Sequence, residues 1–267
     1  MDTNTFLQTH HVFNLEEAVQ ALAPSGGRKA TLERLSYAAD KGKLINLARG
    51  VYASVPSGIE PGKFQPDRFL AAKALRPDAI FSHHSALELL GAAHSEWRLC
   101  TAYSARRSQL FELDGLELRF LSHPQPLLRK QAAELGTGSV HRLDRELRVT
   151  GPERTLIDGF RRPDLVGGLA EFVESAAGFP ILELPLLYEL LDAFGQKMLW
   201  AAVGWFLDTY RAAFFVSDGD LVFLEKHAPK APLYLSRDQR GGVLARRWNL
   251  IVPGELLEGG EPDESEH

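Results

Sequence analysis

The sequence predicts an α+β protein in which a small N-terminal domain of helices and one hairpin precedes a larger mixed α/β domain. Three observations support this fold class. Apolar residues recur at helical spacing up to residue 40, and a short apolar stretch then reverses at Arg49-Gly50. Beyond residue 67, short β-like runs alternate with helical segments. Residues 57–66 contain Pro and Gly and are expected to form a linker between the two domains.

The first helices are recognised by their capping residues and apolar faces. A helix is expected over Thr3–Thr9, followed by a short extended piece. Asn14 and Glu17 have the spacing of a capping box, in which each side chain accepts a hydrogen bond from the backbone amide of the other residue. The apolar face of the helix that they begin is formed by Leu15, Ala18, Val19 and Leu22.

A third helix is expected from near Arg28 to Gly42, with Leu32, Leu35 and Ala39 as its buried face. The hairpin that follows turns at Gly50, which tolerates positive φ because it has no Cβ. Residues 1–56 therefore have the order helix, helix, turn, helix and two-stranded wing. This order is typical of a winged helix-turn-helix DNA-binding domain.

Residues 67–253 predict the second, mixed α/β domain. Helices are expected at 67–75, at 82–92 with Ser82 as cap, at 151–160, at 163–178 through Gly167 and Gly168, at 183–194 and at 196–210. Strands are expected at 79–81, 98–104, 116–123, 146–150, 212–216, 221–225, 231–236 and 247–252. Residues 254–267 hold six acids and no Lys or Arg, which predicts a disordered acidic tail.

Bulk composition narrows the function class. The single cysteine, Cys100, excludes an internal disulfide and a multi-cysteine zinc site, and it favours a reducing, cytoplasmic location. The N-terminus lacks the pattern of a signal peptide, and the longest apolar run, Met198–Leu207, is too short to span a membrane. Without the acidic tail the chain has 30 basic and 29 acidic residues, so any contact with nucleic acid must come from a local patch.

Such a patch lies between Arg28 and Arg49, where six basic residues are accompanied by only two acids. The N-terminal part of a recognition helix enters the major groove, whereas a wing reaches phosphates or the minor groove. We therefore expect contacts with double-stranded DNA from the third helix and from the hairpin region. The expected residues are Arg28, Lys29, Thr31 and Arg34 on the helix, and Lys41, Lys43, Asn46 and Arg49 on the wing and before it.

Other polar residues favour structural roles. His83 and His84 are neighbours on a helix and point about 100° apart, so they are poorly placed to chelate one metal ion. Asp158 is expected to cap a helix or to pair with an Arg, and Tyr52 to pack the wing onto the helices. Asp218 and Asp220 lack the carboxylate and lysine spacing of a nuclease. The sequence predicts no catalytic residue, no metal site and no cofactor.

Four segments together resemble the AbiEi-type antitoxins of bacterial abortive-infection systems, which act as transcriptional regulators. The segments are GKLINLARGVYA, FSHHSALELLGAA, VTGPERTLIDGFRRPDLVGGLAEFVESA and WNLIVP. The resemblance implies an N-terminal DNA-binding domain that represses the protein's own operon. It also implies that residues 67–253 form a domain that counters a nucleotidyltransferase-like toxin without a tight complex.

The leading hypothesis is a non-enzymatic, cytoplasmic DNA-binding protein: the antitoxin and autorepressor of an AbiE-like type IV toxin–antitoxin operon, with a role in phage defence. Two alternatives stay open. One is a winged-helix regulator of the same architecture without a toxin partner. The other is a phage-defence nuclease in which the winged helix serves as a targeting module.

Overall fold

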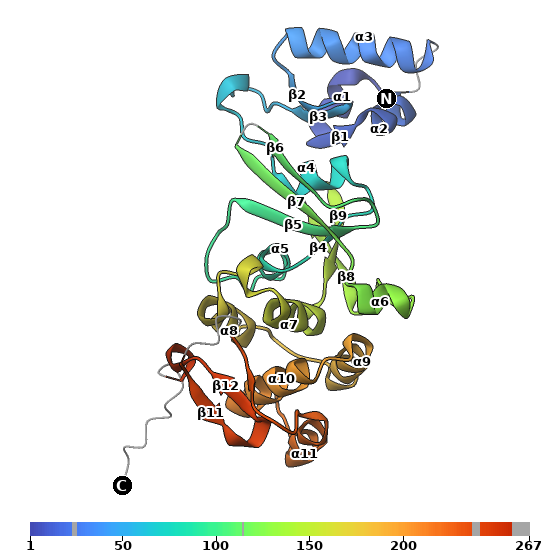
Figure 1. Cartoon of the computed structure of the whole chain (residues 1–267). Coiled ribbons are helices and arrows are strands. Elements are labelled where there is room, and N and C mark those ends of the chain that lie inside the picture. Colours follow the sequence, from blue (N-terminus) through green and yellow to red (C-terminus); the bar gives the residue numbers. More distant parts are fainter. Residues whose placement is uncertain (23–25, 114, 237–240, 258–267) are drawn as a thin grey trace. The chain divides into compact units, whose positions relative to one another are not determined.

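The computed structural model of the protein describes residues 1–22, 26–113, 115–236 and 241–257 (Figure 1). Within these residues it has 11 α-helices and three β-sheets, which confirms the predicted mixed α+β class. The chain divides into two compact units, and neither is continuous in sequence. Unit 1 comprises residues 1–81, 97–122 and 139–148, and unit 2 comprises residues 82–96, 123–138 and 149–267. The expected linker at 57–66 thus lies inside unit 1.

Residues 1–55 of unit 1 form what we call the N-terminal module. Its elements are α1 (Thr3–Thr9), β1 (Val12–Asn14), α2 (Leu15–Leu22), α3 (Gly27–Asp40), β2 (Leu44–Ala48) and β3 (Val51–Ser54). The three strands form an antiparallel sheet in the order β1-β3-β2. The core of the module consists of Phe6, Leu7, Phe13, Leu15, Ala18, Leu22, Leu35, Ala38 and Leu44. Tyr52 packs against this core and stacks on Phe13, as expected from the sequence.

The rest of unit 1 is a short helix on a six-stranded sheet. The 3-10 turn η1 (Pro61–Lys63) leads to α4 (Arg68–Leu75), which packs against β1 and β3 of the module as well as β5 and β7. The strand order is β6-β7-β5-β4-β9-β8. The strands are β4 (Ile80–Phe81), β5 (Leu99–Ser104), β6 (Gln109–Leu113), β7 (Leu116–Ser122), β8 (Thr137–Arg142) and β9 (Arg145–Thr150).

The sequence did not predict the two edge strands of this sheet, β6 and β8. Both are largely exposed along their length, so their residues lack the apolar alternation that marks a half-buried strand. The expected strands at 98–104, 116–123 and 146–150 are confirmed as β5, β7 and β9. These inner strands carry the buried positions of the sheet, such as Leu118 and Leu147.

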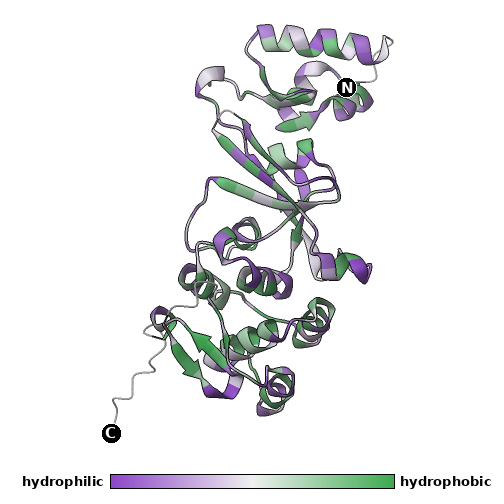
Figure 2. Ribbon diagram, viewed as in Figure 1, coloured by the Kyte–Doolittle hydropathy of each residue, from purple (hydrophilic) through white to green (hydrophobic). Residues whose placement is uncertain are grey.

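Unit 2 is mainly helical, and its core lies among α7, α8, α9 and α10. Figure 2 shows how strongly hydrophobic residues dominate α9 and α10. Its helices are α5 (His84–Leu89), α6 (Gln125–Arg129), α7 (Pro152–Arg161), η2 (Pro163–Leu165), α8 (Leu169–Ala177), α9 (Leu184–Phe194), α10 (Lys197–Thr209) and α11 (Asp218–His227). The small third sheet has the order β10-β12-β11 and is formed by β10 (Leu233–Tyr234), β11 (Val243–Ala245) and β12 (Leu250–Val252). Two 3-10 turns, η3 (Arg246–Trp248) and η4 (Gly254–Leu256), complete the unit.

Several sequence predictions in unit 2 were wrong. Residues 221–225 belong to α11 and do not form a strand, because a capping box between Ser217 and Asp220 begins a helix there. Residues 212–215 form a turn after α10, and Val216 belongs to no strand. Ser82 is not the cap of α5, since the N-cap position is His83, which adopts a φ of 56°.

Gly167 and Gly168 were expected inside one continuous helix, but they separate η2 from α8. Their φ values are 87° and 90°, a conformation that favours glycine and ends the helical path. The acidic tail was expected to be disordered from residue 254. Instead residues 254–256 form η4, and Leu256 and Leu257 pack against the core of unit 2. Residues 258–267 lie outside the described part of the chain.

Candidate nucleic-acid interface

Two helix caps fix the shape of the N-terminal module. At α1, the Asp2 carboxylate accepts hydrogen bonds from the amides of Asn4 and Thr5 at 2.9 and 3.1 Å. At α2, the predicted capping box is confirmed. The Glu17 amide donates to Asn14 Oδ1 at 3.0 Å, and the Asn14 amide donates to Glu17 Oε2 at 2.8 Å. Both caps provide hydrogen-bond partners for amides that an isolated helix would leave without them. The local sequence therefore determines the residue at which each helix begins.

Helix α3 is rotated relative to the sequence prediction. Its buried residues are Thr31, Leu35 and Ala38, whereas Leu32 is 39% exposed and Ala39 is exposed. Thr31 is fully buried because its hydroxyl donates to the Gly27 carbonyl at 3.1 Å, which removes the cost of burying a polar group. The prediction that Thr31 is available to DNA was therefore wrong.

The other α3 residues that were expected to contact DNA differ in how freely their side chains can do so. Arg28 is exposed but forms an ion pair with Glu16 of α2. Arg34 borders a groove of about 600 Å³ between α1 and α3, which Tyr37 and Lys43 also line. Lys29 is exposed and makes no hydrogen bond or ion pair to any other residue in the described ranges. Lys29 and Arg34 are thus cations of α3 that no ion pair in the described ranges engages.

The hairpin formed by β2 and β3 presents the remaining expected residues. Asn46 and Arg49 are exposed, and the register shifts between Asn46 and Ala48. Gly50 has a φ of 76°, and its carbonyl accepts a hydrogen bond from the Leu15 amide at 2.8 Å. This bond ties the hairpin turn to the first residue of α2, so Arg49 lies beside the start of that helix.

Lys41 and Lys43 lie at the junction between α3 and β2. The Lys43 ammonium donates to Asn4 Oδ1 of α1 at 3.0 Å. The Lys41 ammonium lies 5.5 Å from the ring centroid of Tyr37. Both cations also line a second groove of about 820 Å³ that runs along α1 and residues 54–61. The module therefore brings six of the eight expected residues to its surface as unpaired or lightly engaged groups, with Arg28 and Thr31 as the exceptions.

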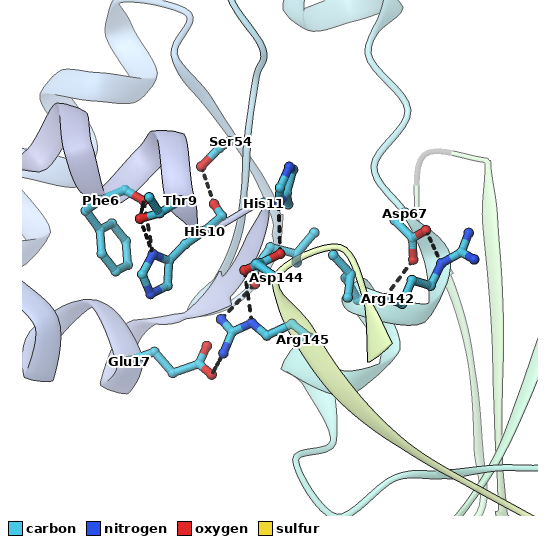
Figure 3. A network of polar contacts seen from close by, with 12 residues as sticks. Phe6, Thr9, His10, His11, Glu17, Ser54, Asp67, Arg142, Asp144 and Arg145 are labelled. Carbon is cyan, nitrogen blue, oxygen red and sulfur yellow. Dashed lines mark hydrogen bonds and ion pairs between the residues drawn. The ribbon is translucent and has the colours of Figure 1, made fainter. Parts of the chain in front are cut away.

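A polar network that the sequence did not predict joins the module to the β8–β9 hairpin (Figure 3). Arg145 donates from Nη1 to Glu17 Oε1 at 2.8 Å and from Nη2 to the Val12 carbonyl at 3.1 Å. Asp144 Oδ1 lies 2.7 Å from His11 Nδ1. All of these residues belong to unit 1. The charge-dense sequence HRLDRELR, residues 141–148, is the signal that marks this segment.

A second bond from the same hairpin reaches the start of α4. Arg142 Nε donates to Asp67 Oδ2 at 2.6 Å, and the other oxygen of this carboxylate caps α4 by accepting from the amides of Phe69 and Leu70. The Arg142 guanidinium also lies over the Phe69 ring, 4.7 Å from its centroid. The Arg142 contacts thus hold the start of α4 on the β8–β9 hairpin, as the Arg145 contacts hold the N-terminal module.

The histidine pair of unit 2 is buried, and the two rings have different partners. His84 Nδ1 lies 2.9 Å from Glu88 Oε1, and His84 Nε2 lies 3.5 Å from Glu171 Oε1. His83 Nδ1 lies 2.9 Å from the Ser82 hydroxyl. Burial lowers the pKa of His83 to about 4, although Asp158 opposes this shift, so the ring is neutral at pH 7.

The carboxylates that the sequence singled out in unit 2 are held by neighbouring side chains. Asp158 accepts from Arg154 Nε at 3.0 Å and from Arg161 Nη1 at 3.2 Å, which confirms the expected pairing with arginine. Asp218 pairs with Arg211 at 2.9 Å, and Asp220 belongs to the capping box of α11. In the part of the chain that the structure describes, no three or more His, Cys, Asp or Glu side chains gather so that they could hold a metal ion.

Charge is distributed unequally between the two units. Unit 1 contains 17 Lys and Arg against 13 Asp and Glu, whereas unit 2 contains 13 against 22. Long-range attraction to a polyanion is therefore expected from unit 1 alone. In the described ranges, no helix has both the length and the apolar character required to cross a membrane.

Comparisons with known proteins identify a solved structure of similar fold but give no function. No known protein family and no curated protein matches the sequence. Among solved structures, the chain is similar to the crystal structure of the RV2827C protein from Mycobacterium tuberculosis, with a TM-score of 0.62. The similarity covers 96% of this chain and 92% of that chain at 17% sequence identity. The two proteins thus share an overall fold.

Proposed function

We propose that the protein is a DNA-binding transcriptional repressor whose N-terminal module is a winged helix-turn-helix. The observation that carries this proposal is the order α1-β1-α2-α3-β2-β3 with a β1-β3-β2 sheet. In this arrangement α3 is the recognition helix, and the β2–β3 hairpin is the wing. Lys29 and Arg49, one on each element, are exposed cations without an ion pair in the described ranges.

The module supports docking on DNA by geometry as well as by charge. In Figure 1, α3 lies on the outer side of the module, away from α4. The Gly50 carbonyl accepts a hydrogen bond from the Leu15 amide, so the hairpin turn that carries Arg49 is tied to the start of α2. The network around Arg145 holds α2 and β1 of the module on the β8–β9 hairpin, so the module is held on unit 1 before it meets DNA.

We further propose that the target is the operator of the protein's own operon and that unit 2 carries an antitoxin activity in the cytoplasm. This part rests on the resemblance of four sequence segments to AbiEi-type antitoxins. The acidic balance of unit 2 is consistent with a role other than DNA binding. The functional partner would be a nucleotidyltransferase-like toxin, countered without a tight complex.

The DNA-binding proposal is tested by fluorescence anisotropy with the full chain and duplex DNA from upstream of its own gene. The double variant Lys29→Ala/Arg49→Ala should bind more weakly and lower the salt slope by about two units, because two phosphate or base contacts are lost. The matched control is Lys226→Ala/Lys230→Ala, which removes two exposed cations from unit 2. Equal affinities for all three proteins would overturn the assigned interface.

The antitoxin proposal is tested by separating the two activities. A Lys29→Ala/Arg34→Ala/Arg49→Ala variant should lose repression of its own promoter. Expressed from a foreign promoter, it should still rescue growth when the adjacent toxin gene is induced. Repression without any rescue by the wild type would favour a regulator that has no toxin partner.

The nuclease alternative is tested with Asp218→Ala/Asp220→Ala and a metal-dependent DNA cleavage assay. Asp220 caps α11 and also accepts a hydrogen bond from the Tyr188 hydroxyl at 3.0 Å, which favours a structural role. Cleavage by the wild type that the double variant lacks would replace the repressor proposal with an enzymatic one.

A further inference from the structure

The outward face of α3 carries an acidic residue at its centre. Lys29, Glu33, Ser36 and Asp40 follow one another at intervals of four, three and four residues, so they form one row along the helix. All four are exposed, and the row lies opposite the buried face formed by Thr31, Leu35 and Ala38. On the proposed function, this row is the surface that enters the major groove.

The Glu33 carboxylate has no partner within the described part of the protein. The Glu33 side chain makes no hydrogen bond or ion pair with any residue in the described ranges, and the same holds for the side chains of Lys29 and Ser36. The acids of the neighbouring helix α2 behave differently: Glu16 pairs with Arg28, and Glu17 pairs with Arg145. The module thus neutralises both carboxylates of α2 but leaves Glu33 available in the middle of the proposed reading face.

A free carboxylate on such a face has a defined energetic consequence. It is repelled by the phosphates of any DNA, which lowers affinity for all sequences alike. The repulsion is offset only where the carboxylate meets a hydrogen-bond donor, because an ionised carboxylate can only accept. In the major groove, the N4 amino group of cytosine is such a donor, and Glu and Asp are the side chains that pair with it.

Lys29 complements Glu33 on the preceding turn. Its ammonium can only donate, and guanine presents two acceptors, N7 and O6, in the major groove. Residues four apart are separated by about 6 Å along a helix axis, a distance that spans roughly two base-pair steps of about 3.4 Å. The two side chains can therefore read base pairs that are adjacent or nearly so.

We propose that Glu33 is a specificity-determining residue that accepts a hydrogen bond from a cytosine N4 amino group, while Lys29 donates to a guanine close by. This inference rests on the proposed function and deepens it by naming the sequence class that the protein selects. The preferred site contains a G·C pair whose cytosine is read by Glu33. Guanine and thymine at that position would present only acceptors to the carboxylate, and adenine would present its N7 acceptor beside the N6 donor, so Glu33 disfavours all three.

The test is selection of bound duplexes from a randomised DNA library with the full-length protein and its variants. The wild type should select cytosine at one position. Glu33→Gln should change that preference to adenine, since Gln pairs with adenine N6 and N7. Glu33→Ala should lose the preference by roughly 5- to 150-fold while binding random DNA more tightly than the wild type.

The control is Glu60→Gln, which removes one negative charge from an exposed position outside α3. It should leave the selected sequence unchanged. Retained DNA binding with the same preference in both Glu33 variants would overturn the inference and leave the proposed function intact. Failure of the wild type to retain any DNA would instead overturn the proposed function, and the inference with it. Equal melting temperatures of the free proteins exclude misfolding, because Glu33 is exposed and makes no hydrogen bond or ion pair within the described ranges that its loss could break.

Discussion

Arg145 and Glu17 are separated by 128 residues in the chain, yet Arg145 Nη1 donates to Glu17 Oε1 at 2.8 Å. The other oxygen of the same carboxylate accepts from the Asn14 amide at 2.8 Å and so caps α2. One side chain therefore begins a helix of the N-terminal module and anchors the module to strand β9. This bond is one of the contacts that hold the module on the rest of unit 1, together with Arg145–Val12, His11–Asp144 and the packing of α4 on β1 and β3.

Loss of Arg145 should destabilise the module. Arg145→Ala leaves a capping carboxylate, the Val12 carbonyl and Asp144 without their guanidinium partner, and the site is only partly exposed to water. We expect a loss of about 1–3 kcal/mol in the free energy of unfolding. Urea denaturation measures it, with faster hydrogen exchange in β1 and α2 as the local readout. Arg107→Ala removes an exposed arginine elsewhere in unit 1 and should change neither quantity.

The orientation of α3 can be tested with a pair of leucines three residues apart. Leu35 is 1% exposed in the core of the module, so Leu35→Ala should cost about 2–5 kcal/mol. Leu32→Ala should cost less than about 1 kcal/mol, because Leu32 faces solvent. Thermal unfolding distinguishes the two. Equal losses in the free energy of unfolding at both positions would show that Leu32 is buried, as the sequence alone suggests, and would contradict the observed orientation of α3.

That difference illustrates what the sequence can and cannot predict. The order of elements in the module and the Asn14–Glu17 capping box follow from local spacing and hydrogen-bonding chemistry. The face of α3 does not, since choosing Leu32 over Thr31 ranks residues by apolarity and overlooks the hydroxyl bond to the Gly27 carbonyl. Local backbone hydrogen bonds of this kind let a polar residue replace an apolar one in a core.

Long-range features were equally hidden. The apolar stretch 221–225 predicts a strand, but in the structure it belongs to α11, which the Ser217–Asp220 capping box begins. The Arg145 network could not be found by pattern, because it depends on a hairpin from residues 139–148 joining unit 1. For the candidate site, the sequence identified the cationic region but not that Arg28 is engaged by Glu16.

Stability should depend on pH through His83. Burial lowers its pKa from 6.5 to about 4 in the folded protein. Between these values the unfolded chain binds the extra proton, so stability is greatest above pH 6.5 and falls as the pH decreases towards 4. The full change corresponds to about 3 kcal/mol, from about 1.4 kcal/mol for each unit of pKa.

The measurement compares melting temperatures across this range for the wild type and His83→Asn, a substitution that tolerates the positive φ at this position. The variant should be less sensitive to acid than the wild type. His141→Asn, which alters an exposed histidine, should keep the wild-type pH dependence. An identical slope for His83→Asn and the wild type would mean that His83 is not the responsible group.

Two truncations should differ in their effect on unit 2. Removing residues 254–267 deletes Leu256 and Leu257, which pack against the core, and should cost about 1–3 kcal/mol. Removing only residues 258–267 deletes no large apolar side chain and should leave the melting temperature unchanged. Differential scanning calorimetry of both truncated proteins gives the comparison directly.

The most direct test of the central claim is hydrogen–deuterium exchange of the full chain with and without saturating duplex DNA from upstream of its gene. If unit 1 binds DNA through a winged helix-turn-helix, protection should concentrate in residues 27–54, the segment from α3 through the β2–β3 hairpin. Unit 2 should exchange at the same rate in both states. Protection confined to unit 2, or none at a DNA concentration at which anisotropy reports a complex, would contradict a winged-helix mode of binding.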